Sequence, residues 1–464
     1  MVGILIPPRR ASLAPRGKHS DSPEVDILLP LRRALFTVKI NIARRVSATR
    51  DRHKLSCVGF DSNILCTGAY LLLQQTFWRK LKREVFSRYN TSMSEGIGSK
   101  KGGFKVPREI VIGGFANVKR ISLGGENPIA LQTMWKESIA ALDTQKFTSI
   151  LERIASVEAL GCDIIRFAVP DMQSAASLCQ IAQCTHIPLV ADIHFDYRLA
   201  LECLKGDVAA IRINPGNIGS TEHTKALVEL CREKGRAMRI GVNSGSLPQD
   251  LAQKAHSGEI PRSKALVEAA LREAAVFDEM GFSNYAVSMK ASSVRETVEA
   301  NEAFARLSDT PLHVGVTEAG PLICGIVKST LAFSQLLGEG IGSTIRVSLS
   351  SSMENEVIAG KEILRECGLR KGGVTLVSCP RCGRLGFDVH SFVERWQNRL
   401  LSLDKDITVA VMGCAVNGPG EGRWADLGIT GGGGKCVIFK KGKIVRTVDE
   451  ENADKVFAEE LESL

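Results

Sequence analysis

The chain has 464 residues, of which 44% are apolar, and this is enough for two domains or for one large barrel with a smaller domain. It contains no run of eighteen apolar residues, which excludes a membrane-spanning helix, and its N-terminal region lacks the continuous apolar stretch of a secretory signal. The net charge of +9 comes from residues 1–92, which hold 17 Lys and Arg against 6 Asp and Glu, whereas residues 93–464 hold 43 against 45, so the main body lacks the positive charge of a nucleic-acid-binding protein.

Residues 1–105 are predicted to be an N-terminal extension that is disordered or non-native. They contain basic and apolar stretches, but not the regular alternation that begins near Val106. The stretch 67–89 has the composition of a basic amphipathic helix, which leaves a targeting or membrane-surface role open. We favour an extension outside the folded protein, with Met93 as the natural start of the chain.

From Val106 onward, short β-rich segments alternate with segments of helical periodicity. In the helical segments 147–160 and 224–235, apolar residues recur at i, i+3, i+4 and i+7. This alternation predicts an α/β fold, a (β/α)8 TIM barrel over residues 106–370, because a doubly wound sheet rarely needs eight equivalent units. The eight predicted strands are 129–134, 164–169, 189–194, 210–215, 238–243, 285–290, 312–318 and 344–350.

After about Lys371 the alternation ends, and residues 371–464 are predicted to form a smaller α+β domain. This domain contains Cys379 and Cys382 in "CPRCGR" and Cys414 in "GCAVNGPGE". The chain has thirteen cysteines and no signal peptide, so a disulfide framework is not expected, and most of the cysteines are expected to be small buried side chains.

Charged and polar residues recur at the predicted C-terminal ends of the barrel strands, where the active sites of TIM barrels form. Four arginines and a lysine converge there, and each is costly to bury without a partner. Asp192 and Glu318 could pair with two of these five cations; the remaining charges favour a diphosphate ligand, and a purely structural network of ion pairs is the alternative. The residues at these strand ends are Arg166, Asp192, His194, Arg212, Asn214, Arg239, Asn243, Ser288, Lys290, Thr317, Glu318, Arg346, Ser348 and Ser350.

The three cysteines Cys379, Cys382 and Cys414 favour an iron–sulfur cluster over zinc. A zinc ribbon would need a second CxxC or a histidine pair, and His390 is the only histidine of this domain. Three thiolates can hold a cubane cluster with one iron free for another ligand. Glu421, seven residues after Cys414, is the candidate for that position, because a carboxylate is a harder and more easily displaced ligand; the alternative is a solvated loop residue.

Taken together, "CPRCGR", "GCAVNGPGE", "ADIHFDYRLAL", "RINPGNIG", "RIGVNSGSL" and "VTEAG" resemble the 4-hydroxy-3-methylbut-2-enyl diphosphate synthases of the methylerythritol phosphate route to isoprenoids. The resemblance extends from about Val106 to the C-terminus. It implies a TIM barrel followed by a [4Fe–4S] domain. The implied reaction is the reductive opening of 2-C-methyl-D-erythritol 2,4-cyclodiphosphate, with two electrons from flavodoxin or ferredoxin and the loss of water. A cytoplasmic homodimer without nucleic-acid or membrane partners is also implied.

The resemblance also implies roles for individual residues. Cys379, Cys382, Cys414 and Glu421 would hold the cluster, and Glu318 and Glu421 would act in catalysis. The residues expected to bind the substrate are Arg166, Asp192, Arg212, Asn214, Arg239, Asn243, Lys290, Arg346 and Ser348.

Two loops depart from the family pattern. This chain has "MWKES" at 134–138 where the family usually has "MTNT", and Pro321 and Leu322 after "TEAG" where two small residues are usual. Two other functions stay open on the residues alone. One is a non-redox TIM-barrel enzyme acting on an anionic substrate such as a pterin, with a structural zinc domain; the other is a zinc-ribbon module that binds nucleic acid.

Overall fold

The computed structural model describes residues 103–214, 218, 221–383, 386–414, 420 and 422–464. The extension predicted for residues 1–105 therefore lies outside the described residues, except for its last three. Within the described part of the chain, every helix is too short or too polar to span a bilayer.

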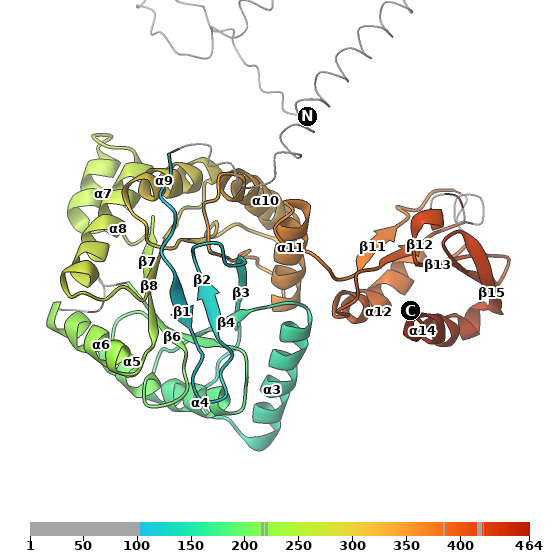
Figure 1. The fold of residues 1–464 in the computed structure, drawn as a ribbon, viewed down its shortest axis with the longest axis horizontal. Coiled ribbons are helices and arrows are strands. Elements are labelled where there is room, and N and C mark those ends of the chain that lie inside the picture. Colours follow the sequence, from blue (N-terminus) through green and yellow to red (C-terminus); the bar gives the residue numbers. More distant parts are fainter. Residues whose placement is uncertain (1–102, 215–217, 219–220, 384–385, 415–419, 421) are drawn as a thin grey trace, which may run out of the picture. The chain divides into compact units, whose positions relative to one another are not determined.

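The first large unit is a parallel eight-stranded sheet with the order β8-β7-β6-β5-β4-β3-β10-β9 (Figure 1). An isolated parallel bridge between Val287 and Leu312 joins the two ends of the sheet, so that it closes into a barrel. All eight predicted strands are present, although β9 and β10 are reduced to two residues each. The strands are β3 (Ala130–Met134), β4 (Ile164–Ala168), β5 (Leu189–Ile193), β6 (Ala210–Ile213), β7 (Ala237–Asn243), β8 (Tyr285–Lys290), β9 (His313–Val314) and β10 (Thr344–Ile345).

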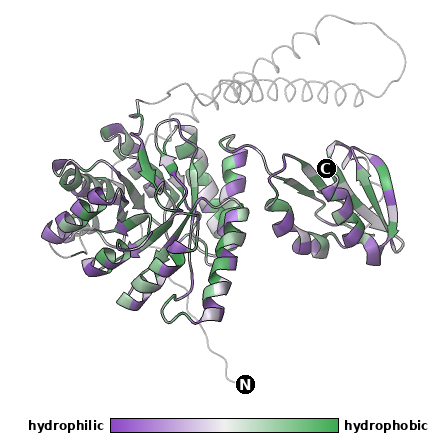
Figure 2. Ribbon diagram, turned by 60° about the horizontal axis from the view of Figure 1, so that its bottom comes forward, coloured by the Kyte–Doolittle hydropathy of each residue, from purple (hydrophilic) through white to green (hydrophobic). Residues whose placement is uncertain are grey.

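Helices surround the barrel and bury their apolar faces against it (Figures 1 and 2). Local sequence sets where several of them begin: the carboxylates of Asp143 and Asp171 each accept a hydrogen bond of 2.7 Å from a backbone N–H in the first turn of α3 and α4. The barrel helices are α3 (Thr144–Ala159), α4 (Met172–Gln183), α5 (Tyr197–Cys203), α6 (Thr221–Glu233), α7 (Gln249–His256), α8 (Arg262–Glu279), α9 (Val294–Leu307), α10 (Leu322–Gly338) and α11 (Met353–Glu366).

An antiparallel hairpin of β1 (Ile110–Ile112) and β2 (Ile121–Leu123) precedes the barrel. Its apolar side chains share one buried cluster with the first residues of the barrel strands, among them Ala130, Ile164 and Ala210. The hairpin therefore covers the end of the barrel at which the strands begin, and the other end, where the strands terminate, is left for a ligand.

The C-terminal domain contains a five-stranded mixed sheet with the order β11-β12-β13-β14-β15. Strands β11, β12 and β13 are parallel, and β14 and β15 are antiparallel to their neighbours. Phe392 and Trp396 pack against Phe457, with ring centroids 5.1 and 4.9 Å apart, so α12 and α14 share one core. The elements are β11 (Thr375–Ser378), α12 (Val389–Leu401), β12 (Thr408–Val411), η2 (Gly422–Trp424), β13 (Leu427–Gly432), β14 (Lys435–Lys440), β15 (Lys443–Asp449), η3 (Glu450–Asn452) and α14 (Ala453–Glu462).

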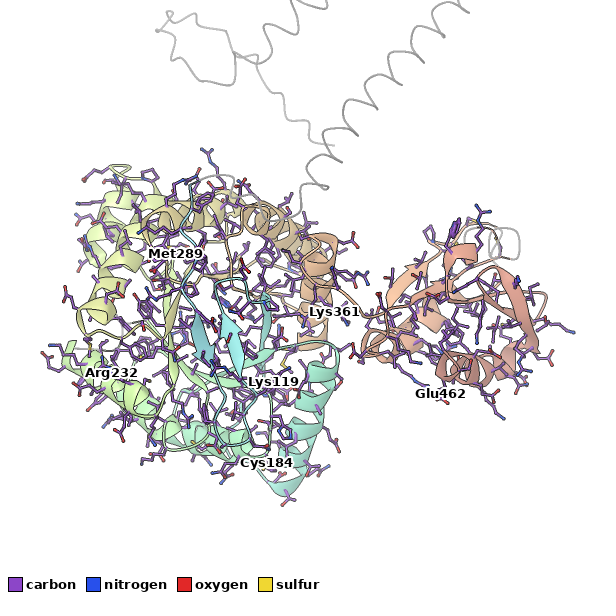
Figure 3. The ribbon with its side chains drawn as sticks, in the orientation of Figure 1. Lys119, Cys184, Arg232, Met289, Lys361 and Glu462 are labelled. Atoms are coloured by element: carbon purple, nitrogen blue, oxygen red, sulfur yellow. The ribbon has the colours of Figure 1, made fainter. Side chains whose placement is uncertain are left out.

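Polar side chains lie mostly on the outside of both folded parts. Figure 3 shows the exposed side chains of Cys184 and Arg232 at the periphery of the barrel. The charged side chains inside the barrel, described next, are therefore exceptions that need an explanation.

Candidate active site

Asp192, at the C-terminal end of β5, pairs with two arginines of the neighbouring strands. Its Oδ1 lies 2.9 Å from Arg212 Nη1, and its Oδ2 lies 3.4 Å from Arg166 Nε and 3.6 Å from His194 Nε2. Burial by itself would raise the pKa of Asp192, but the charges of Arg166 and Arg212 and the hydrogen bond with His194 lower this pKa well below its usual range. Asp192 is thus ionised and orients the guanidinium groups beside it.

Arg346, which follows β10, pairs with Glu356 of α11. Arg346 Nη2 lies 3.1 Å from Glu356 Oε1, and Arg346 Nε lies 3.3 Å from Oε2. From the sequence we expected Glu318 to supply the second carboxylate. Glu318 is instead exposed in the turn after β9, where its φ of +50° is unusual for a residue with a side chain. Glu318 and the described cations form no ion pair, and Glu356 takes the place expected for it.

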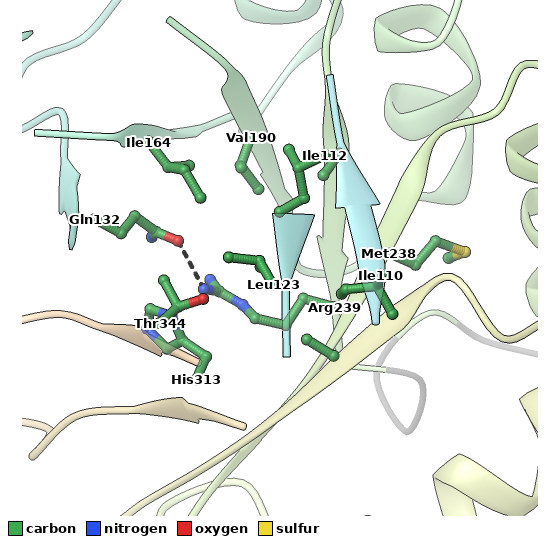
Figure 4. Close-up of a pocket in the computed structure, with 12 residues that line it drawn as sticks. Ile110, Ile112, Leu123, Gln132, Ile164, Val190, Met238, Arg239, His313 and Thr344 are labelled. Carbon is green, nitrogen blue, oxygen red and sulfur yellow. Dashed lines mark hydrogen bonds between the residues drawn. The ribbon is translucent and has the colours of Figure 1, made fainter. Parts of the chain in front are cut away.

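Arg239 and Lys290 are both buried, and neither forms a salt bridge with a described residue. Arg239 Nη1 donates to Gln132 Oε1 at 2.9 Å (Figure 4), and Lys290 Nζ lies 3.0 Å from His313 Nε2. Burial and the surrounding positive charges lower the pKa values of both Arg239 and Lys290. Burial also lowers the pKa of Arg166, to about 10, against the opposing charge of Asp192.

Arg239 lies deeper than a strand-end residue. It is the third residue of β7, next to Arg212 in the register of the sheet, and it lines a small cavity that the hairpin residues Ile110 and Ile112 close (Figure 4). Its Nε and Nη2 atoms are buried without a hydrogen-bond partner in the described structure. An unpartnered guanidinium edge of this kind is costly unless a ligand or water meets it.

The remaining predicted substrate residues surround these cations. Asn214 is buried and donates to Ser246 Oγ at 3.2 Å, and Asn243 is paired with Lys290 in the register of β7 and β8. Ser348 is partly buried, two residues after Arg346. Gln132, His313 and Glu356 were not predicted from the sequence, because nothing in the local pattern distinguishes them from ordinary strand and helix residues.

The predicted cysteine ligands lie in two loops at one edge of the C-terminal sheet. Cys379 directly follows β11, and Cys414 comes three residues after β12, the parallel neighbour of β11. Backbone hydrogen bonds join the two loops: Cys379 N donates to Val411 O at 2.9 Å, and Gly386 N donates to Gly413 O at 2.8 Å. Cys382 is exposed, whereas Cys414 is buried.

The described side chains around these thiols do not by themselves form a metal site. No three described His, Cys, Asp or Glu side chains converge tightly enough to hold a metal ion, and Glu421 lies outside the described residues. Other cysteines have a structural character, since burial raises the pKa of Cys162 and of Cys231 to about 12 and that of Cys436 to about 11.

Family models match both folded parts of the chain. Residues 115–361 match the GcpE TIM-barrel domain, and residues 375–463 match the GcpE protein C-terminal domain. Among solved structures, a dihydropteroate synthase from Coxiella burnetii has a TM-score of 0.38 and 13% identity, covering 54% of this chain and 94% of its own, which is too distant to bear on function.

Curated relatives cover most of the chain and nearly their own whole length. The protein named 4-hydroxy-3-methylbut-2-en-1-yl diphosphate synthase (flavodoxin) from Treponema denticola is 57% identical over 78% of this chain and 99% of its own. The protein of the same name from Treponema pallidum is 57% identical over 77% of this chain and 92% of its own. The one from Clostridium acetobutylicum is 44% identical over 75% of this chain and 97% of its own. The resemblance inferred from the sequence motifs is confirmed, and the chain belongs to the GcpE family of 4-hydroxy-3-methylbut-2-en-1-yl diphosphate synthases.

Proposed function

We propose that this chain catalyses the reductive ring opening of 2-C-methyl-D-erythritol 2,4-cyclodiphosphate to 4-hydroxy-3-methylbut-2-enyl diphosphate. Family membership supports this reaction. The structural observation that carries the proposal is the pair of buried cations, Arg239 and Lys290, that no described carboxylate neutralises. A cyclic diphosphate would supply the negative charge that neutralises these two cations.

Substrate binding is proposed to use the cations around Asp192. Because Asp192 already orients Arg166 and Arg212, little side-chain entropy remains to be lost when a phosphate binds them. Lys290, Arg239 and Arg346 contribute further positive charge, and arginine forks match the paired oxygens of phosphate groups. The full proposed set is Arg166, Asp192, Arg212, Asn214, Arg239, Asn243, Lys290, Arg346 and Ser348.

Cys379, Cys382, Cys414 and Glu421 are proposed to hold a [4Fe–4S] cluster, which supplies low-potential electrons and a Lewis acid for the departing oxygen. The support is the placement of the cysteine loops on adjacent parallel strands. Glu421 is proposed as the displaceable ligand. Glu318, which is exposed after β9, is proposed to transfer a proton to the substrate.

The names of the relatives support flavodoxin as the electron donor, with ferredoxin as the alternative. We further infer a cytoplasmic homodimer in which the cluster domain of one chain caps the barrel of the other. This arrangement rests on the resemblance alone.

Metal analysis and turnover together test the proposed function. Protein purified without oxygen is expected to contain about four irons with sulfide per chain and to form the ring-opened product with reduced flavodoxin. Iron and activity are expected to fall together in air, because an iron held by a carboxylate is readily extracted. Stoichiometric zinc in place of iron, with activity that is stable in air, would overturn the iron–sulfur cluster and favour the non-redox enzyme with a structural zinc domain.

A further inference from the structure

Glu356 is a buried carboxylate for which the proposed function has no role. It lies on α11 with a fully buried side chain. Its two oxygens accept hydrogen bonds from four groups of the barrel: Lys136 Nζ at 2.7 Å, Thr133 Oγ1 at 2.8 Å, Leu349 N at 3.0 Å, and Arg346 at 3.1 and 3.3 Å. An ionised carboxylate has about four acceptor sites, so these donors satisfy the buried Glu356 side chain.

The charge of Glu356 is stabilised by the two cations that it contacts. Burial would raise the pKa of Glu356, but the charge of Arg346 and the hydrogen bond from Lys136 outweigh it and lower this pKa below its usual value. One negative charge thus faces two positive charges, and the group of three carries a net positive charge. Since Glu356 is held by Thr133 and Leu349, it fixes the positions of both cations.

Lys136 belongs to "MWKES", the loop after β3 that departs from the family pattern. Its ammonium has three donors; one meets Glu356 Oε1, and another meets Leu349 O at 2.7 Å. The side chain remains 29% exposed, and together with Arg346 it lines a pocket that also includes Ala168, the last residue of β4, and Pro170, which follows the strand. Lys136 therefore lies at the C-terminal end of the barrel, with a third donor available.

We infer that Lys136 is a further cation of the substrate site, and that Glu356 is the positioning residue that holds Lys136 and Arg346 together as a clamp for a phosphate group. The inference rests on the proposed function for the identity of the substrate, but the chemistry it requires is only that of a phosphate or diphosphate anion. Cations that are already held in position lose little side-chain entropy when such an anion binds. If Lys136 only neutralised Glu356, replacing Lys136 would leave the affinity of the site for anions unchanged.

The Lys136→Met variant tests the clamp. Loss of one charge-assisted contact is expected to raise KM for the cyclic diphosphate about tenfold, with kcat changed less than about twofold, and Lys136→Arg is expected to restore most of the affinity. Lys146→Met is the matched control, because Lys146 Nζ also donates to a backbone carbonyl, Ala140 O at 3.1 Å, but is not part of the pocket. Equal KM values for Lys136→Met and the wild type would overturn the inference.

Glu356→Gln tests the positioning role. This change is expected to raise KM at least as much as Lys136→Met. Glu354→Gln on the same helix removes the ion pair with Arg153, which does not involve the proposed clamp, and is expected to leave KM unchanged. The double variant of Lys136 and Glu356 is expected to be less impaired than the two separate effects combined, because both act through one clamp. Fully independent effects would contradict the coupling.

Calorimetric titration of the anaerobic holoenzyme with inorganic pyrophosphate separates this inference from the proposed function. Pyrophosphate is expected to bind the wild type and to bind Lys136→Met about tenfold more weakly. If pyrophosphate binds in this way but no ring-opened product forms, the clamp stands and the proposed reaction fails. If the two proteins bind pyrophosphate equally while the wild type turns over, the reaction stands and the clamp fails.

Discussion

At the scale of single residues, the end of the barrel contains two kinds of cation. Arg166 and Arg212 are preset by Asp192, whereas Arg239 and Lys290 have only neutral partners. Arg166 and Arg212 are therefore oriented before a ligand binds. Arg239 and Lys290 have positive charge that no described carboxylate compensates. A site that combines both is suited to an anion that must be bound tightly and in one orientation.

Asp192→Asn is expected to destabilise the protein and weaken substrate binding together. The neutral amide leaves Arg212, which is 4% exposed, without its charged partner, and breaking a buried ion pair of this kind costs about 3–5 kcal/mol. Chemical denaturation measures the loss. Asp196→Asn is the control, since Asp196 pairs with Arg198 at the surface and is expected to cause no measurable change. Equal stability of Asp192→Asn and the wild type would show that the pair is not needed for folding.

Glu421→Gln and Cys414→Ala are expected to differ in iron content. Three thiolates still anchor a cubane in Glu421→Gln, so iron is retained while activity falls sharply, because the amide is a poorer ligand and does not transfer protons. Cys414→Ala leaves two thiolates, and the cluster is expected to be lost. Iron and sulfide analysis with anaerobic turnover measures both. Equal iron loss would make Glu421 a structural residue, and full activity of Glu421→Gln would remove it from the mechanism.

At the scale of elements, adjacent parallel strands bring distant loops together. Strands β11 and β12 pair from Thr375–Thr408 to Ser378–Val411, so the loops that carry Cys379 and Cys414 leave the sheet side by side. The position of the cysteines therefore depends on the packing of this sheet. Gly428 of β13 lies opposite Phe439 of β14, and a Cβ added at Gly428 would meet the buried ring of Phe439.

Gly428→Ala is expected to lower the free energy of unfolding of the C-terminal domain by about 1–3 kcal/mol, because the close-packed ring has no room to move. The decrease in the midpoint of thermal or denaturant unfolding measures this loss of free energy. Gly432→Ala in the same strand is the matched control, since an added Cβ there meets no atom within 4 Å. A similar midpoint for both variants would show that the sheet adjusts without cost.

At the scale of the whole molecule, the described domains match the family and the N-terminal segment is the part without an assigned role. The family models begin at residue 115, and the basic charge of the chain lies in residues 1–92. A chain that starts at Met93 is expected to fold, bind its cluster and turn over like the full chain. Solubility, iron content and anaerobic activity measure this, and an insoluble or inactive product would make residues 1–92 a necessary part of the protein.

Local patterns determined much of this protein from its sequence. The alternation of strands and helices predicted all eight barrel strands, because burial on both faces of a parallel sheet leaves a short continuous apolar run for each strand. The four arginines and the lysine at the strand ends predicted an anion site, and the motifs around the cysteines and strand ends identified the family. The hairpin of β1 and β2 was not predicted, since two three-residue strands are too short to show a period.

Only the tertiary structure decided which charges compensate one another. Glu356 contacts Thr133 and Lys136 across 223 and 220 residues of chain, and no local pattern indicates a pair of that separation. It also decided that Glu318 is exposed and that Arg239 lies deep in the barrel beside Gln132. The physical reason is that periodicity depends on which face of an element is buried, whereas the partner of a buried charge depends on how the closed barrel brings distant strands and helices together.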